Sequence, residues 1–438
     1  MNADHGIRAR LTGLSSLRVG APVGDSASAG AGGKMAAARW RVGFLAAGAV
    51  SGAVVAAWLY ISGFSSVNLD RLLESPLSFH ALVVLPSLLA LLLLALATLP
   101  RIFLVNLAVF VSLIGAVEAA VWALAPTPAP VRGEPVALQG PTFYRPDATL
   151  GYALAPSVVA RHQRTEGSAE VYSVIYEIDE RGRRRTPTTP LQARRSFLLF
   201  FGDSNTFGEG LGQSDTLPYY AGELAAAYRP YNYGVPGYGP PHMLELLKVR
   251  RFAQEVSEPE GYAFFFLIPA HIARVIGSST VSTGWGRHFP YYQVAPDGGL
   301  VAAGDFAHGR PLTTLLYYFW NRSNLVSFLG VDLPPRYTDR DYRLTAKVLA
   351  EGGRRLARQV RLRGFYVVLG QAYNAPQLQV LEEMRSALAR EGVSSLDYAR
   401  LLDAHDLRYR VSELDLHNSG EANRAMAAKL VSDLRIGR

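Results

Sequence analysis

The sequence predicts an α/β sandwich with a parallel sheet, preceded by three transmembrane helices and a small β-rich lead-in. Two observations lead to this prediction. The first third of the 438-residue chain holds three long apolar stretches, each close to the ~20 residues that a helix needs to cross the hydrocarbon core of a bilayer. After residue 195, short apolar runs alternate with longer helical stretches, which is typical of a parallel sheet covered by helices.

The three apolar stretches are predicted membrane spans. They comprise residues 42–62, 79–99 and 102–124. The first is too long for a signal peptide and lacks a cleavage site followed by a polar start. Positive charges precede it, and Arg101 lies in the turn between the second and third stretches. By the positive-inside rule this turn and the N-terminus are cytoplasmic. We therefore expect a protein of the bacterial inner (cytoplasmic) membrane, with everything after Leu124 periplasmic or extracellular.

The basic charge of the chain is concentrated at its start. Residues 1–41, expected to be a disordered cytoplasmic tail, hold six Lys or Arg and two Asp, which is half of the net charge of +8. A basic tail beside an apolar stretch is explained by membrane topology, so no nucleic-acid partner is expected. The chain has no cysteine, which excludes disulfides, thiolate metal sites and a cysteine nucleophile.

Residues 125–195 are expected to connect the membrane region to the main domain. Residues 125–141 form a Pro-rich linker that cannot continue a helix. Val171–Ile178 is rich in β-branched and aromatic residues and predicts a strand in a β-rich lead-in. The basic turn Asp179–Arg185 that follows is expected to be a solvated face.

Residues 196–438 are predicted to form the α/β domain. Its expected strands are Phe197–Phe201, Tyr231–Val235, Ala263–Ile268 and Phe365–Gly370. Its expected helices are Asp215–Tyr228, Pro241–Glu255, Tyr342–Arg363, Ala375–Glu391 and Ser419–Leu434. In such sheets a site forms at the carboxyl ends of the strands, so the residues that follow each strand are the first candidates for chemistry.

Ser204 directly follows the first of these strands, in the segment GDSNTFG that spans residues 202–208. A serine at a turn from strand to helix can expose its hydroxyl at the sheet edge. The N–H groups at the start of the helix can then stabilise a developing oxyanion.

Asp415 and His417 lie near the C-terminus, just before the last predicted helix. A serine hydroxyl is a weak nucleophile that needs a neighbouring general base, and imidazole titrates nearest to neutral pH. An acid beside the histidine fixes its tautomer, and Asp415 can do so from the same loop. Glu413 is a second, less favoured acid.

Together these segments resemble the SGNH/GDSL hydrolase family, in a bacterial membrane-anchored form. The matching segments are GDSNTFG, NYGVPGYG and DLHNSGEAN, and the resemblance covers residues from about 197 to 435. It implies an SGNH-type three-layer α/β/α sandwich with Ser204 as the nucleophile, His417 as the base and Asp415 as the acid. It also implies that the N–H groups of Ser204 and Gly237 stabilise the oxyanion.

The sequence departs from the family pattern after the third strand. The family supplies an oxyanion asparagine there in a Gly-x-Asn-Asp segment, whereas this chain has Ile268-Pro269-Ala270-His271. Losing one oxyanion donor costs roughly 10²–10³ in rate in other enzymes, so a substitute is expected. His271 is the first candidate, with a structural role weighed equally, and Asn374 is the second.

An aromatic-rich insertion is expected at about residues 272–341, where the α/β rhythm is lost. Its aromatic residues include Trp285, Phe289, Tyr292 and Trp320. Two interpretations stay open: these residues form a small core of the insertion, or they cap the site and bind sugar rings or acyl chains.

The resemblance implies an esterase that acts on acyl esters, in the first place acetyl esters, of cell-envelope glycan or lipid. One alternative is the O-acyltransferase module of a polysaccharide acetylation system, which would need a multi-span acyl-donor membrane protein as its partner. A second is a catalytically inactive scaffold that binds glycan. No metal and no organic cofactor is implied by any of these interpretations.

Overall fold

The computed structural model describes residues 89, 101–124, 142–167, 169–187 and 194–436. The chain divides into two units, Met1–Gly115 and Ala116–Arg438. The predicted spans 42–62 and 79–99 lie outside the described residues, apart from residue 89. The third corresponds to helix α5, Arg101–Leu124. Among the described residues this is the one helix long and apolar enough to cross a membrane, over Val105–Leu124.

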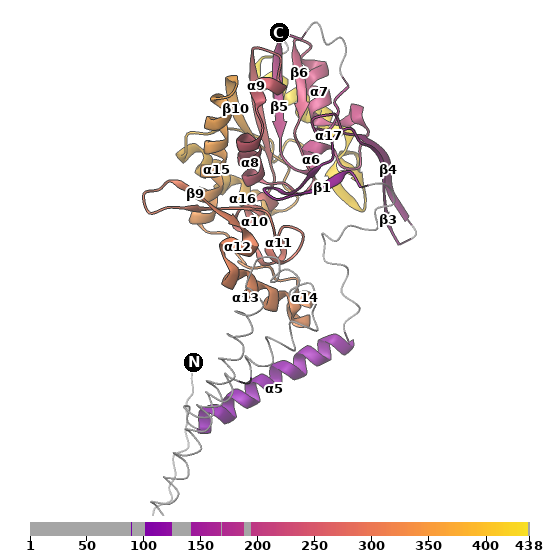
Figure 1. The fold of residues 1–438 in the computed structure, drawn as a ribbon. Coiled ribbons are helices and arrows are strands. Elements are labelled where there is room, and N and C mark those ends of the chain that lie inside the picture. Colours follow the sequence, from indigo (N-terminus) through magenta and orange to yellow (C-terminus); the bar gives the residue numbers. More distant parts are fainter. Residues whose placement is uncertain (1–88, 90–100, 125–141, 168, 188–193, 437–438) are drawn as a thin grey trace, which may run out of the picture. The chain divides into compact units, whose positions relative to one another are not determined.

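A parallel five-stranded sheet forms the centre of the second unit (Figure 1). Its spatial order is β11-β10-β7-β5-β6. The strands are β5 (Ser196–Phe201), β6 (Tyr228–Asn232), β7 (Glu260–Leu267), β10 (Arg361–Leu369) and β11 (Ser394–Asp397). Because β5 pairs with β6 on one side and with β7 on the other, the chain reverses its direction of winding beside the carboxyl end of β5. Ligand sites of open α/β sheets lie at such points.

Helices cover both faces of the sheet, which confirms the α/β class. Every residue of β5 is buried, and its side chains alternate between two cores, as the period of two in a strand requires. Phe197, Leu199 and Phe201 pack in the core with α8, α15 and α16, while Leu198 and Phe200 pack with α7 and α17. These helices are α7 (Leu217–Leu224), α8 (Pro240–Val249), α15 (Asp339–Ala357), α16 (Ala375–Arg390) and α17 (Gly420–Leu434).

Several predicted boundaries were wrong. The strand expected over Tyr231–Val235 spans Tyr228–Asn232. The helix expected to end at Tyr228 already ends at Leu224, and Tyr228 begins β6, an edge strand that tolerates Pro230. The helix expected up to Arg363 ends at Ala357, because β10 already begins at Arg361. The helix expected over Pro241–Glu255 is broken into α8 and α9 (Phe252–Glu255).

Two antiparallel hairpins form the lead-in before the sheet. β1 (Tyr144–Asp147) pairs with β2 (Gly151–Leu154), and β3 (Val159–Glu166) pairs with β4 (Ala169–Glu177). Their buried side chains share a core with residues of the main domain, including Phe207 and Tyr238. The lead-in therefore packs directly against the loops that follow β5 and β6.

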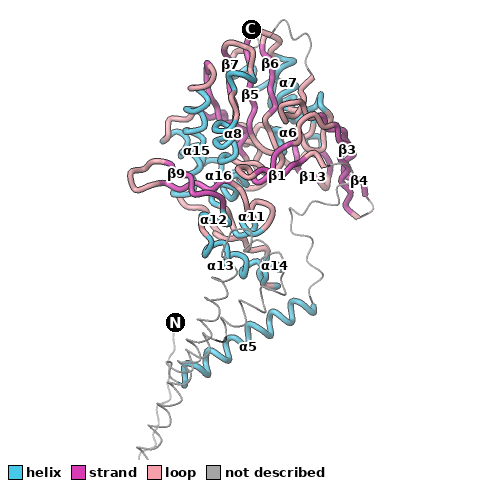
Figure 2. Tube along the Cα trace, viewed as in Figure 1, coloured by secondary structure: helices cyan, strands magenta, loops and turns pink. Residues whose placement is uncertain are grey.

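The insertion has its own helices and a hairpin. Its elements are α10 (Ala270–Ile276), α11 (Ser279–Thr283), β8 (Pro290–Val294), β9 (Leu300–Asp305), α12 (Phe306–Gly309), α13 (Pro311–Arg322) and α14 (Asn324–Leu329). In Figure 2 the helices α11 to α14 gather at one end of the domain, beside β9. Phe289 and Phe306 are fully buried in a small core there, so these aromatic residues belong to the insertion's own core.

The remaining elements lie beside the nucleophile strand. α6 (Ser204–Phe207) follows β5, with the short 3₁₀ turn η3 (Gln213–Asp215) after it. Near the C-terminus, the 3₁₀ turn η4 (Leu407–Tyr409) leads into β12 (Arg410–Ser412), which pairs with β13 (Asp415–Asn418). This arrangement brings residues from about 204 and about 417 to the same edge of the sheet.

Candidate active site

The backbone around Ser204 is built as a sharp turn from strand to helix. Ser204 begins α6, and the Asp203 carboxylate before it caps the helix by accepting a hydrogen bond from the Asn205 N–H at 3.0 Å. Gly202 has a φ of +150°, and a Cβ there would lie 2.3 Å from Oγ1 of Thr206. Glycine at this position therefore lets the helix start directly against the end of β5.

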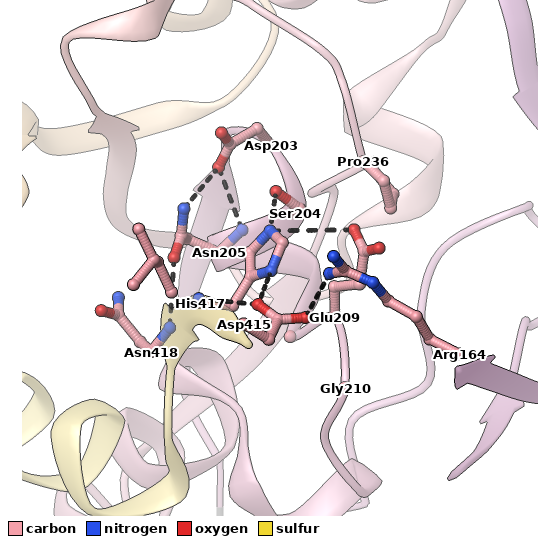
Figure 3. Close-up of polar contacts among 12 residues, drawn as sticks. Arg164, Asp203, Ser204, Asn205, Glu209, Gly210, Pro236, Asp415, His417 and Asn418 are labelled. Atoms are coloured by element: carbon pink, nitrogen blue, oxygen red, sulfur yellow. Dashed lines mark hydrogen bonds and ion pairs between the residues drawn. The ribbon is translucent and has the colours of Figure 1, made fainter. Parts of the chain in front are cut away.

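Ser204, His417 and Asp415 form a continuous chain of hydrogen bonds (Figure 3). His417 Nε2 lies 2.7 Å from Oγ of Ser204, and His417 Nδ1 lies 2.5 Å from Oδ1 of Asp415. The backbone N–H of His417 donates to the same carboxylate oxygen at 2.9 Å. A ring held in this way through Nδ1 presents Nε2 to the serine, which is the orientation a general base needs.

Arg164 of β3 binds the other oxygen of Asp415, a contact that the sequence did not suggest. Its Nη1 lies 2.9 Å from Asp415 Oδ2, and the carboxylate is almost fully buried. Burial alone would raise the pKa of Asp415. The hydrogen bond from His417 and the charges of His417 and Arg164 outweigh burial and lower this pKa below its ordinary value. Asp415 is therefore ionised throughout the neutral range.

Glu209 is a second carboxylate beside the imidazole. Its Oε2 lies 3.9 Å from His417 Nε2, the nitrogen that faces Ser204. Burial lowers the pKa of His417, but the hydrogen bond to Asp415 and the negative charge of Glu209 outweigh this effect. The result is a pKa of about 9. Glu209 was not predicted from the sequence, where its only signal was its position five residues after the serine.

Gly237 lies in the loop after β6, with a φ of +84°. A Cβ there would lie 2.1 Å from the Tyr152 hydroxyl and 2.8 Å from the Trp285 ring. The Tyr152 hydroxyl donates to the Pro236 carbonyl at 2.6 Å, which fixes the peptide before Gly237. The lead-in and the insertion therefore meet at this loop, and Trp285 is one insertion aromatic that remains partly exposed beside it.

His271 does not occupy the position expected of an oxyanion donor. It is fully buried, its Nδ1 accepts the Ile268 N–H at 3.1 Å, and its Nε2 lies 3.1 Å from the Tyr238 carbonyl. With both ring nitrogens already bound, the structural alternative weighed for His271 describes it better. Asn374 caps α16, because its side-chain oxygen accepts the Gln377 N–H at 2.9 Å.

Arg274 of α10 and Asp203 form an ion pair beside the turn that carries Ser204. Arg274 Nη1 donates to Asp203 Oδ2 at 2.9 Å and to the Tyr238 carbonyl at 2.7 Å. Burial would raise the pKa of Asp203, but the neighbouring His271 and Arg274 hold it well below its ordinary value. This ion pair joins the loop that carries Ser204 to the loop that carries Gly237.

The basic turn Asp179–Arg185 of the lead-in also differs from its prediction. Arg183 and Arg184 are buried, whereas the turn was expected to be a solvated face. The Arg184 guanidinium lies over the rings of Tyr176 and Phe207 and donates to two backbone carbonyls of the loop after Ser204. Arg184 is thus a structural anchor of the site.

One group of potential metal ligands occurs among the described residues. It consists of His288, Asp305 and His308 in the insertion. The Asp305 carboxylate already pairs with both imidazoles, at 3.0 Å and 2.7 Å, and none of the three residues belongs to the Ser204 chain of hydrogen bonds. This group is therefore separate from the candidate catalytic residues.

Comparisons with known proteins give distant similarities. No protein-family model matches the chain, and no curated protein matches it in sequence. A solved α/β hydrolase enzyme from the metagenome of Lake Arreo is similar with 16% identity and a TM-score of 0.33, covering 56% of this chain and 98% of its own. A lipolytic protein of the G-D-S-L family from Veillonella parvula has 14% identity and a TM-score of 0.31, with 54% and 97% covered. A carbohydrate acetylesterase from Sinorhizobium meliloti has 9% identity and a TM-score of 0.31, with 55% and 98% covered.

Proposed function

We propose that the protein is a serine esterase of the SGNH type that is anchored in the membrane and acts outside the cytoplasm. Its substrates are acyl esters, in the first place acetyl esters, of cell-envelope glycan or lipid. One observation carries the proposal: the unbroken hydrogen-bond chain from Ser204 Oγ through His417 to Asp415. A serine connected in this way to a base and an acid is an activated nucleophile.

The reaction proceeds through an acyl-enzyme. His417 Nε2 takes the proton of the Ser204 hydroxyl while Oγ attacks the acyl carbonyl. The N–H groups of Ser204 and Gly237 are the proposed donors to the oxyanion. His417 then gives its proton to the leaving alcohol, and water releases the acid from the acyl-enzyme in a second, analogous step.

The membrane location is part of the proposal. Helix α5 supports it, since Val105–Leu124 is apolar and long enough to span a bilayer. Membrane attachment would keep the enzyme beside substrates of the cell envelope. If a sugar hydroxyl replaced water in the second step, the same site would act as an O-acyltransferase, with a multi-span membrane protein as the acyl donor.

The test is the hydrolysis of p-nitrophenyl acetate by the full chain in detergent. The wild type is compared with Ser204→Ala and His417→Ala, which remove the nucleophile and the base. We expect both variants to lose at least about 10³-fold in turnover, because the members of such a unit act together. Equal, background-level rates in all three proteins would exclude a simple serine esterase and leave a partner-dependent O-acyltransferase or a glycan-binding scaffold.

A further inference from the structure

Glu209 lies at the site but has no role in the reaction of Ser204 with His417 as written so far. Its carboxylate is mostly buried, and Oε2 lies 3.9 Å from the Nε2 atom of His417. In Figure 3 it lies beside the ring nitrogen that faces Ser204, whereas Asp415 bonds the other ring nitrogen. Glu209 therefore lies next to the space that the nucleophile attacking the acyl-enzyme must occupy.

The lead-in holds the loop around Glu209 firmly. Arg184 donates to the carbonyls of Gly208 and Leu211, at 2.9 Å and 2.6 Å. The hydroxyl of Tyr176 accepts the Gly210 N–H at 2.8 Å. These three contacts fix the backbone on both sides of Glu209.

The side chain of Glu209 is fixed as well. The Tyr172 hydroxyl donates to Glu209 Oε1 at 3.2 Å, so Oε2 is the oxygen turned toward His417. Burial, followed by the charge of Glu209, raises the pKa of Tyr172 far above its ordinary value. Tyr172 is therefore a permanent donor, and Glu209 is an oriented acceptor.

The 3.9 Å between Glu209 Oε2 and His417 Nε2 matches a water molecule that is hydrogen-bonded to both atoms. A water oxygen about 2.8 Å from both His417 Nε2 and Glu209 Oε2 would form an angle of roughly 90° at the water, near enough to its two hydrogen directions. Water has one proton for the imidazole and a second for the carboxylate. A simple alcohol has one proton only and cannot satisfy both groups.

We propose that Glu209 is the residue that binds and orients the water that hydrolyses the acyl-enzyme. The water oxygen forms a bond to the acyl carbon, and one water proton passes to His417 Nε2. The bond from the acyl carbon to Ser204 Oγ then breaks, and His417 returns that proton to Oγ. The second water proton stays hydrogen-bonded to Glu209 and leaves with the carboxylic acid, so the enzyme is regenerated unchanged.

This inference rests on the proposed esterase function. It distinguishes hydrolysis of the acyl-enzyme from transfer of the acyl group to an alcohol. A carboxylate that accepts a hydrogen bond from the second O–H of water favours hydrolysis over acyl transfer to a simple alcohol. Removing it should slow the release of the acyl group more than its capture. The two half-reactions can be separated, because p-nitrophenol appears at acylation and the free enzyme returns only at deacylation.

The decisive experiment is stopped-flow release of p-nitrophenol by the full chain in detergent. Glu209→Gln keeps the size of the side chain and an oxygen for Tyr172 but removes the charge. Above about pH 9, where His417 is neutral in both proteins, we expect a burst close to one equivalent, followed by a steady rate that is roughly 10–100-fold below the wild type, as for the loss of a hydrogen bond to a charged group. Hydroxylamine, a stronger nucleophile than water, should restore much of the steady rate by resolving the acyl-enzyme directly.

Glu383→Gln is the matched control. Glu383 is exposed on α16, so its substitution changes the net charge equally but should leave burst and steady rate as in the wild type. If Glu209→Gln behaves like this control, the role of Glu209 is excluded while the esterase stands. If the wild type is no faster than Ser204→Ala, the esterase and the role of Glu209 are excluded together.

Discussion

The pKa of His417 determines the pH at which the site can act. Several charges face this ring: Asp415 at Nδ1, Glu209 at Nε2 and Asp203 nearby, with Arg164 behind Asp415. Burial lowers the pKa of His417, but the hydrogen bond to Asp415 and the negative charges of Glu209, Asp415 and Asp203 outweigh burial and raise this pKa to about 9. Only the neutral imidazole accepts the proton of Ser204, and at pH 7 it is about 1% of the total.

The expected result is an alkaline profile. kcat/KM for p-nitrophenyl acetate should rise about tenfold per pH unit from pH 6 and level off near pH 9, because raising the pH removes the proton from His417. Glu209→Gln removes a negative charge that stabilises the imidazolium, so its profile should move to lower pH, by about one unit. A wild-type profile that levels off near pH 6.5 would contradict this electrostatic picture.

The second prediction concerns Arg164, which holds the carboxylate of Asp415 in position. Arg164→Gln removes the partner of Asp415 Oδ2 and leaves a buried carboxylate held by His417 alone. We expect kcat to fall about tenfold and the free energy of unfolding to fall by about 1–3 kcal/mol, the range for a buried group that loses its hydrogen-bond partner. Activity assays and urea unfolding measure the two effects.

Arg161→Gln is the matched control on the same strand. Arg161 is exposed, and its Nη1 lies 3.4 Å from the Ser173 hydroxyl, in a surface contact that contributes little. This variant should keep wild-type activity and stability. Equal behaviour of the two arginine variants would mean that the lead-in does not support the acid.

At the scale of elements, the loop after β6 is tightly packed around Gly237. Gly237→Ala places a Cβ 2.1 Å from the Tyr152 hydroxyl and 2.8 Å from Trp285, at a φ of +84°. We expect the loop to shift and its N–H to lose its alignment. A reduction of kcat by roughly 10²-fold should follow, as when an oxyanion donor is lost.

Gly298→Ala separates the effect of backbone strain from the effect of the contacts. Gly298 has nearly the same φ, +83°, in the turn between β8 and β9, and a Cβ there meets nothing within 4 Å. This variant should lose about 1–2 kcal/mol of stability, the cost of a left-handed residue, with unchanged kcat. If Gly237→Ala also keeps its kcat, the loop does not contribute to the reaction.

The sequence predicted those elements whose signal is local. β5 and most of β7 are apolar runs, so these strands were predicted close to their positions, whereas the ends of three helices were wrong. β11 was missed because it has the short polar sequence SSLD at the edge of the sheet. Ser204 and the DLHNS segment were found because each has a recognisable chemical pattern.

The supporting residues of the site could not be found in this way. Arg164 and Asp415 are 251 positions apart, and no local pattern indicates that they meet. Arg184 looked like a surface charge because neighbouring arginines usually are, whereas its guanidinium replaces water with two carbonyls and two aromatic rings. Such contacts are set by how the lead-in packs on the domain, which is a property of the tertiary fold.

At the scale of the whole molecule, the lead-in and the α/β domain form one packed unit around the candidate site. The lead-in supplies Arg164 to the acid, Tyr172 to Glu209 and Tyr152 to the loop of Gly237. A fragment that begins at β5 would lack all three contacts. The N-terminal border of the functional domain therefore lies before β1, nearer to the predicted linker than to the first strand of the sheet.

The absence of cysteine makes the membrane topology directly testable, because each introduced cysteine is the sole thiol of the chain. We expect a membrane-impermeant maleimide to label Ser66→Cys and Ser386→Cys in intact spheroplasts, and Ala37→Cys only after detergent is added. Three spans place position 37 inside and positions 66 and 386 outside. Position 66 is decisive, since a chain that crosses the membrane through α5 alone would keep both 37 and 66 inside. The unsubstituted chain, which should take up no label, is the control.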